Sequence, residues 1–170
     1  MEEHRWPWVV GRRMNTTMGG EQGSHWLQST RTFLAMSAVG HLMWEILQLP
    51  LYVIWTTETG REITFAIIHC VVGDLIVATL SLVAALLLFG SPAWPSQWLM
   101  PTMVATLVMG MGYAVYSEWV NTVFRKAWAY AELMPVVPLL GTGVSPLMQW
   151  FVVPTMAFAA IWFRHSRMNF

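Results

Sequence analysis

Four long apolar segments constrain the fold of this chain most, because each is long enough to cross a lipid bilayer. A helix rises about 1.5 Å per residue, so about 20 apolar residues span a hydrocarbon core about 30 Å thick. Inside lipid, only helices and closed barrels satisfy their own backbone hydrogen bonds. We therefore predict an all-α fold, an integral membrane four-helix bundle with spans at about 33–55, 63–89, 98–124 and 144–163.

The composition agrees with a membrane protein. The 170 residues are 56% hydrophobic and 11% charged, whereas a soluble domain carries about 25% charged residues. Nine acidic residues balance nine basic ones, so the excess of positive charge typical of nucleic-acid binding is missing and we expect no nucleic-acid partner. The first apolar segment is too long for the core of a signal peptide and contains Glu45, so we expect a retained span.

The arrangement of charges predicts the topology. Residues 1–30 are charged and Gly-rich, which favours a mobile N-terminal arm before a four-span domain at 31–165 and a short C-terminal tail at 166–170. Four spans place both termini on one side of the membrane. That side holds six basic residues and the other holds three, so we expect cytoplasmic termini in a multi-pass protein of the bacterial inner membrane. The two sets are Arg5, Arg12, Arg13, Arg31, Arg164 and Arg167, against Arg61, Arg125 and Lys126.

Two connections and two glycines refine this expectation. The segment 89–97 contains two prolines and predicts a tight hairpin, whereas 121–143 predicts a short interfacial helix followed by an extended or re-entrant piece that caps the bundle. Gly110 and Gly112 allow close approach of neighbouring helices. Pro50 predicts a kink in the first span.

Polar residues interrupt the first apolar segment at helical spacing. In the stretch GHLMWEILQLPLY, the residues His41, Glu45, Gln48 and Tyr52 follow one another at i, i+4, i+7 and i+11, which places them on one face of a helix. A carboxylate inside a membrane costs several kcal/mol unless other groups or water solvate it. This face therefore requires polar partners from neighbouring helices.

Depth along the helices suggests those partners. Helix-rise arithmetic places Glu45 and Asp74 at the same level, about 15 Å below the outer edge, with His69 and Glu118 about 10 Å below it. Two carboxylates facing each other in low dielectric require a proton or a cation between them. The candidates for acid–base or ion-binding roles are Glu45, Asp74, Glu118 and His69, and those for ligand contact are Gln48, Tyr52, Tyr116, Gln149, Trp128 and Tyr130.

A metal ion is one of several ways to neutralise these acids. His41 and Glu45 form an i, i+4 pair, and with His69 and Asp74 they are the candidate metal ligands. A protonated acid or a histidine imidazolium serves equally well. The Glu-x-x-His motif of di-iron bundles does not occur in the sequence, and no particular cofactor is indicated.

The chain resembles a group of small, uncharacterised polytopic proteins of the bacterial inner membrane of a four-helix type. The resemblance extends from about Gly40 to Trp150 and rests on H-L-M-W-E-I-L-Q-L-P-L-Y, H-C-V-V-G-D, S-E-W-V-N and W-A-Y-A-E-L-M-P-V-V-P-L-L-G-T-G-V-S-P-L-M-Q-W. It implies a membrane fold and no particular activity. Glu118, followed by W-A-Y and a Gly-Pro-rich turn, is also loosely similar to membrane carotenoid hydratases.

Three functions fit these residues. The first is binding of a proton, a cation or a small lipophilic ligand for transport or in an accessory subunit, with a homo-oligomer or a larger membrane complex as partner. The second is a membrane-embedded enzyme that acts on an isoprenoid or lipid by carboxyl acid–base chemistry. The third is a structural subunit whose polar groups only fix helix register. Neither a G-x-S-x-G motif nor a phosphate-binding loop occurs in the sequence.

Overall fold

The computed structural model of the protein describes the backbone of residues 8–168 and the side chains of residues 25–167. Arg5 of the predicted arm lies outside this range, as do the side chains of Arg12 and Arg13. The described chain is helical, with two isolated β-bridges and no strand. Its elements are α1 (Trp8–Gln48), η1 (Leu49–Leu51), α2 (Ile54–Thr57), α3 (Gly60–Phe89), α4 (Leu99–Trp119), the π-helical turn η2 (Val120–Phe124) and α5 (Val144–Met168).

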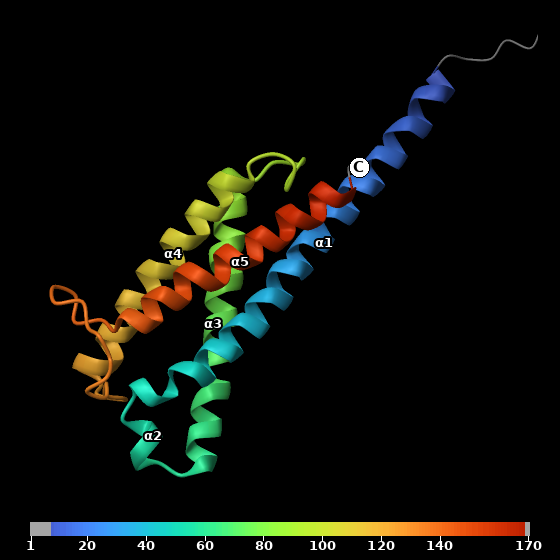
Figure 1. Ribbon diagram of the computed structural model, residues 1–170. Helices are drawn as coiled ribbons and strands as arrows, with labels where there is room; N and C mark the ends of the chain where they lie inside the picture. Colours follow the sequence, from blue (N-terminus) through green and yellow to red (C-terminus); the bar gives the residue numbers. More distant parts are fainter. Residues whose placement is uncertain (1–7, 169–170) are drawn as a thin grey trace, which may run out of the picture.

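The four long helices pack in a closed ring of neighbours. Helix α1 contacts α3 and α5, and α4 contacts the same two helices (Figure 1). The predicted hairpin forms between α3 and α4, where Trp94 is buried and packs edge-on against Trp26 with ring centroids 5.1 Å apart. Residues far apart in the sequence therefore meet between the helices.

The first helix differs from the prediction at both ends. It begins at Trp8 rather than near residue 33, so part of the predicted arm is helical, and it ends at Gln48 rather than near residue 55. Pro50 lies in the short 3-10 helix that follows, because proline has no N–H to continue an α-helix and its ring clashes with the preceding turn. Tyr52 is therefore not on the helical face of Glu45, and that part of the prediction is wrong.

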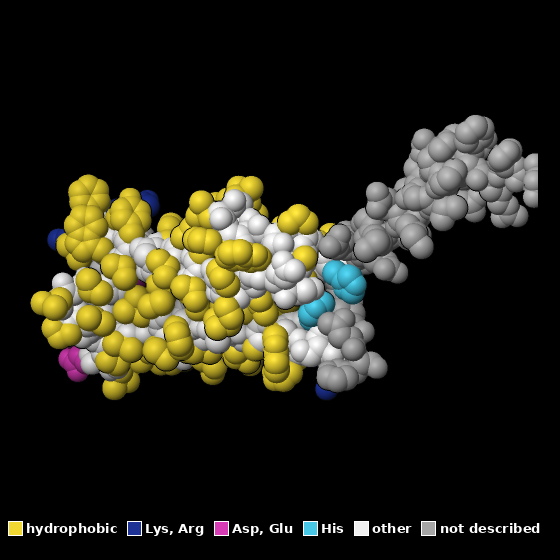
Figure 2. All heavy atoms as spheres, turned by 90° about the horizontal axis from the view of Figure 1, so that it is seen from above, with side chains coloured by type: hydrophobic (Ala, Val, Ile, Leu, Met, Phe, Trp, Pro, Cys, Tyr) yellow, Lys and Arg dark blue, Asp and Glu magenta, His cyan; other side chains and the backbone are white. Residues whose placement is uncertain are grey.

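Three helices are long and apolar enough to cross a membrane within the described residues: Gly60–Phe89, Leu99–Phe124 and Val144–Arg167. Their outward side chains are apolar, as Figure 2 shows for one face, where the visible charged groups lie toward the two ends. Large apolar side chains of α3, among them Phe65, Leu80 and Leu87, are exposed. A soluble monomer rarely exposes such a surface, so this surface is that of a membrane protein.

Helices α3 and α4 are closest near their hairpin and separate toward the other end. The buried residues of α3 all lie in its second half, between Ala78 and Ala85, and Figure 1 shows the two helices diverging from the hairpin. Gly110 of α4 admits the ring of Trp150, since a Cβ there would lie 2.3 Å from the indole. Gly112 makes no such close approach.

The segment 125–143, called the outer loop below, has no interfacial helix, contrary to the prediction. Its backbone pairs instead with the chain after α1: Val53 N–H donates to Ala129 C=O (3.0 Å) and Ala131 N–H donates to Leu51 C=O (2.9 Å). Tyr52 and Tyr130 form an antiparallel β-bridge between these hydrogen bonds. Backbone N–H and C=O groups of the outer loop therefore form hydrogen bonds with the residues after α1 instead of forming a helix within the loop.

Candidate functional site

Helix α1 presents three of its polar residues to the interior. His41 and Gln48 are buried and Glu45 is partly buried, while Leu42 and Ile46 on the other side of the helix are exposed. The predicted polar face is therefore correct up to the end of α1. His41 also packs against the indole of Trp150, with ring centroids 5.2 Å apart.

Gln149 of α5 lies at the centre of the site. Its amide nitrogen is 3.0 Å from a Glu45 carboxylate oxygen, 3.0 Å from an Asp74 carboxylate oxygen and 3.0 Å from His41 Nδ1. His41 Nδ1 is also 3.4 Å from the same Asp74 oxygen. One amide therefore joins the side chains of α1, α3 and α5.

The side-chain amide of Gln149 has too few hydrogens to donate to all three neighbours. A glutamine NH₂ carries two hydrogens, so it donates to at most two of Glu45, Asp74 and His41. Glu45 also accepts from the side-chain amide of Gln48, and His41 Nδ1 lies within 3.4 Å of Asp74, so the three groups share several donors within the cluster. His41 Nε2, at the far side of the ring, is buried and has no hydrogen-bond partner within the described part of the chain.

A chain of hydrogen bonds extends the cluster toward the start of α5. Trp44 Nε1 donates to Ser145 Oγ (3.1 Å), and Ser145 Oγ donates to the side-chain oxygen of Gln48, Oε1 (2.9 Å). The side-chain nitrogen of Gln48 in turn donates to the Glu45 carboxylate (2.9 Å). Neither Ser145 nor Trp44 is among the site residues that the sequence predicted. The spacing of Ser145 and Gln149 at i, i+4, which places both on one helix face, is the signal that identifies the serine.

Glu118 of α4 belongs to a second group of hydrogen bonds at the outer loop. Tyr130 OH donates to the Glu118 carboxylate and accepts from the Gly143 N–H (2.9 Å). A Cβ at position 143 would lie 2.9 Å from Met134 Sδ and 3.2 Å from the Tyr130 ring, so glycine keeps this contact close. Burial, and then the hydrogen bond to Glu118, raises the pKa of Tyr130, so the phenol remains a donor.

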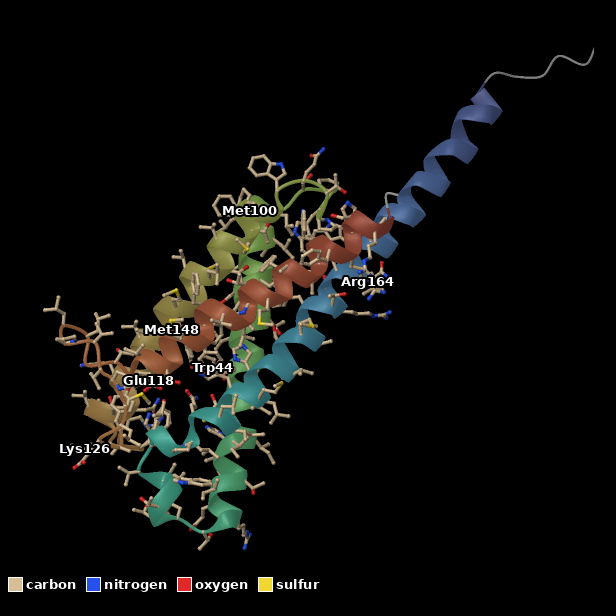
Figure 3. The ribbon with its side chains drawn as sticks, in the orientation of Figure 1. Trp44, Met100, Glu118, Lys126, Met148 and Arg164 are labelled. Carbon is tan, nitrogen blue, oxygen red and sulfur yellow. The ribbon has the colours of Figure 1, made fainter. Side chains whose placement is uncertain are left out.

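The two groups of hydrogen bonds border one cavity of about 290 Å³. All three acids, Glu45, Asp74 and Glu118, line it, and Arg125 is its one lysine or arginine. Figure 3 shows Glu118 and Trp44 between the helices, nearer to Lys126 than to Arg164. Other lining residues include Gln48, Tyr52, His69, Cys70, Gly73, Tyr113, Asn121, Trp128, Gln149 and Trp150.

Two predicted site residues point away from the acids. His69 is exposed and stacks on Phe65, with ring centroids 5.9 Å apart, although it reaches the edge of the cavity. Tyr116 is 62% exposed and does not line the cavity. Each residue turns a helix by about 100°, so His69 is rotated about 140° from Asp74 and Tyr116 about 160° from Glu118.

The described residues contain no group of three or more His, Cys, Asp or Glu side chains arranged to hold a metal ion. The structure therefore does not assemble the metal site for which His41, Glu45, His69 and Asp74 are the sequence candidates. Glu45 and Asp74 instead face the amide of Gln149.

Comparison of the chain with protein-family models, with curated proteins and with solved structures gave no match. Function is therefore inferred from the chemistry of the cavity.

Proposed function

We propose that this is a four-span protein of the bacterial inner membrane whose cavity binds a small cation or a proton, for transport or as an accessory subunit. The supporting observation is the charge of the cavity, which has three carboxylates and a single fixed cation, Arg125. Carboxylates withdrawn from water attract a positive charge strongly. Tyr52, Trp128 and Trp150 line the same cavity and offer aromatic faces suited to an organic cation.

Protons and cations compete for this cavity. The neutral Gln149 of α5 contacts His41 and Glu45 of α1 and Asp74 of α3, with Glu118 of α4 lining the same cavity. Two carboxylates beside one neutral amide in low dielectric repel each other, and a proton or a bound cation relieves this repulsion. Cation binding therefore weakens as the pH falls and the carboxyl groups take up protons.

In the proposed four-span topology this cavity lies in the outer half of the membrane. Helix α1 lies against α3 and α5, which are themselves membrane-capable, and this packing supports α1 as the fourth span. Four spans return both termini to one side, which the distribution of basic residues assigns to the cytoplasm. Four helices are few for a transporter, so we expect a homo-oligomer or a larger membrane complex.

Binding of tetramethylammonium tests this proposal. The purified protein in lipid nanodiscs is titrated with the cation by calorimetry, with protein-free nanodiscs subtracted. We expect binding that strengthens as the pH rises and weakens at least about tenfold in Glu45→Gln and Asp74→Asn. Glu132→Gln, an exposed acid of the outer loop that does not line the cavity, serves as the matched control. Binding that is unchanged in both cavity variants contradicts the proposal.

The second candidate is an enzyme acting on an isoprenoid or lipid. Exposed cavity residues on α3 and α4 support it, because a membrane substrate needs a side opening. In a hydration, Glu45 would give a proton to one alkene carbon while Asp74 takes a proton from the water that adds to the other carbon. Mass spectrometry of an alkene lipid incubated with the protein tests this. A mass increase of one water that Asp74→Asn abolishes supports it, and an unchanged lipid contradicts it.

A further inference from the structure

The exposed residues of the cavity lie along one side of it. Its exposed lining residues are His69 and Gly73 of α3, Tyr113 of α4, and Arg125 just after η2. Every lining residue from α1 and α5 is buried or partly buried. The opening therefore lies between α3 and α4, where the two helices diverge (Figure 1).

This opening lies at the depth of the lipid chains. Gly73 is about 20 Å along α3 from its start at Gly60, on the basis of the helical rise. Val72 and Ile76, on either side of it, are 51% and 55% exposed. A side opening bordered by such residues leads into the hydrocarbon core rather than into water.

Gly73 keeps the opening free of side-chain atoms. A Cβ built at this position meets no atom within 4 Å, so the glycine is not required for packing between helices. Gly112 of α4 is likewise exposed and open, but it does not line the cavity. Both glycines are therefore exposed and open, but only Gly73 lines the cavity.

The cavity also adjoins an outer pocket. This second pocket, of about 800 Å³, is lined by Arg61, Glu58, Lys126 and other residues of the outer end, and it shares Ile54, Ala66 and Trp128 with the cavity. Charged residues at its rim indicate access from water. A route from water to the acids would run along these three shared residues, whereas a route from lipid runs through the apolar opening.

We propose that the physiological ligand is a cationic amphiphile, an ammonium headgroup on a single alkyl chain, that enters from the bilayer. The headgroup binds among Glu45, Asp74 and Glu118. The alkyl chain extends past Gly73 between α3 and α4 into the lipid. The inference rests on the proposed cation site and adds the class of ligand and its route. Because the alkyl chain partitions into lipid, the ligand is concentrated in the membrane beside the opening.

Paired probes test the inference in lipid nanodiscs. Dodecyltrimethylammonium carries the chain, and tetramethylammonium carries the headgroup alone. In Gly73→Leu the added side chain obstructs the opening, so we expect at least about tenfold weaker binding of the tailed probe and a markedly smaller loss for tetramethylammonium, which has no chain to pass the opening. Gly112→Leu, the matched control, leaves both probes unchanged.

The outcomes separate this inference from the proposed function. If Gly73→Leu leaves the tailed probe unaffected while Glu45→Gln weakens binding of both probes, the cation site stands and the side route is overturned. Equal losses in Gly73→Leu and Gly112→Leu also overturn the route, because the effect is then not specific to the opening. If neither probe binds the wild-type protein beyond protein-free nanodiscs, the cation site and the ligand class both fail.

Discussion

Gln149 is the residue on which the geometry of the cavity depends. It donates to Glu45 of α1 and Asp74 of α3 from its own position on α5, and it accepts weakly from Gln48 at 3.4 Å. An amide is neutral at every pH, so it holds the two carboxylates near each other without itself neutralising them. This leaves the cluster able to take up a proton or a cation.

Replacing Gln149 with leucine, which is similar in size, removes the shared donor. We expect the free energy of unfolding to fall by about 1–3 kcal/mol, because buried acceptors on two other helices lose their partner. Thermal denaturation in nanodiscs measures the change. Gln97→Leu, at an exposed position of the α3–α4 hairpin, serves as the control. Equal stability of Gln149→Leu and wild type contradicts the central place of this residue.

The sequence predicted well which polar side chains are candidates for the site. It predicted less well which of these side chains lie close together. Glu45, Asp74, Glu118, Gln48 and Gln149 stand out as polar groups in apolar segments, and all five line the cavity. His69 matches them in depth but not in rotation about the helix axis. The small and polar residues Asp74, Ala78 and Ser81, at i, i+4 and i+7, mark the face of α3 that turns inward, and His69 does not lie on it.

The end of α1 and the outer loop form one element of the site. Pro50 stops α1 after Gln48, and the chain then pairs with residues 129–131 across the Tyr52–Tyr130 bridge. Tyr130 links this pairing to Glu118 and to Gly143 just before α5. The sequence indicated a break at the proline, but pairing between segments about 80 residues apart leaves no local pattern.

The Tyr130 phenol predicts sensitivity to alkali. Its pKa is raised above the usual value of about 10, so its stabilising contribution is complete below that pH and is lost as the pH rises through the higher value in the folded protein. We expect wild type to lose stability above about pH 10 more steeply than Tyr130→Phe, which has no proton to lose. At neutral pH, we expect the amide hydrogens of residues 125–143 to exchange faster in Tyr130→Phe than in wild type, because the variant lacks the hydroxyl that joins Glu118 and Gly143.

Stability measured against pH, together with hydrogen exchange by mass spectrometry, checks both effects. Tyr116→Phe is the matched control, since Tyr116 is exposed and does not line the cavity. Alkaline sensitivity that is the same in Tyr130→Phe and wild type, with no change of exchange in the outer loop, contradicts the assigned role.

The molecule as a whole has an apolar body and charged ends. Its three membrane-capable helices were predicted within a few residues, because long apolar segments leave few alternatives in lipid. The first segment was harder, since α1 continues as a helix through polar residues that length and hydropathy do not distinguish from a loop. Its role as a fourth span stays a prediction.

Cysteine labelling tests the topology. In a Cys70→Ser background, which removes the only cysteine, Leu139→Cys places a thiol at a 97% exposed position of the outer loop. Arg167→Cys places one near the end of α5. We expect a membrane-impermeant maleimide to label Leu139→Cys on intact cells and Arg167→Cys only after permeabilisation. The reverse pattern contradicts cytoplasmic termini, and labelling of both on intact cells contradicts a span between them.

A density map of the protein in nanodiscs with saturating tetramethylammonium shows whether the three acids share one cation. We expect density for the cation in the cavity between Glu45, Asp74 and Glu118, with Gln149 bridging the first two, and no such density in Glu45→Gln. A map in which these carboxylates face separate neighbours, with no shared space between them, would contradict it.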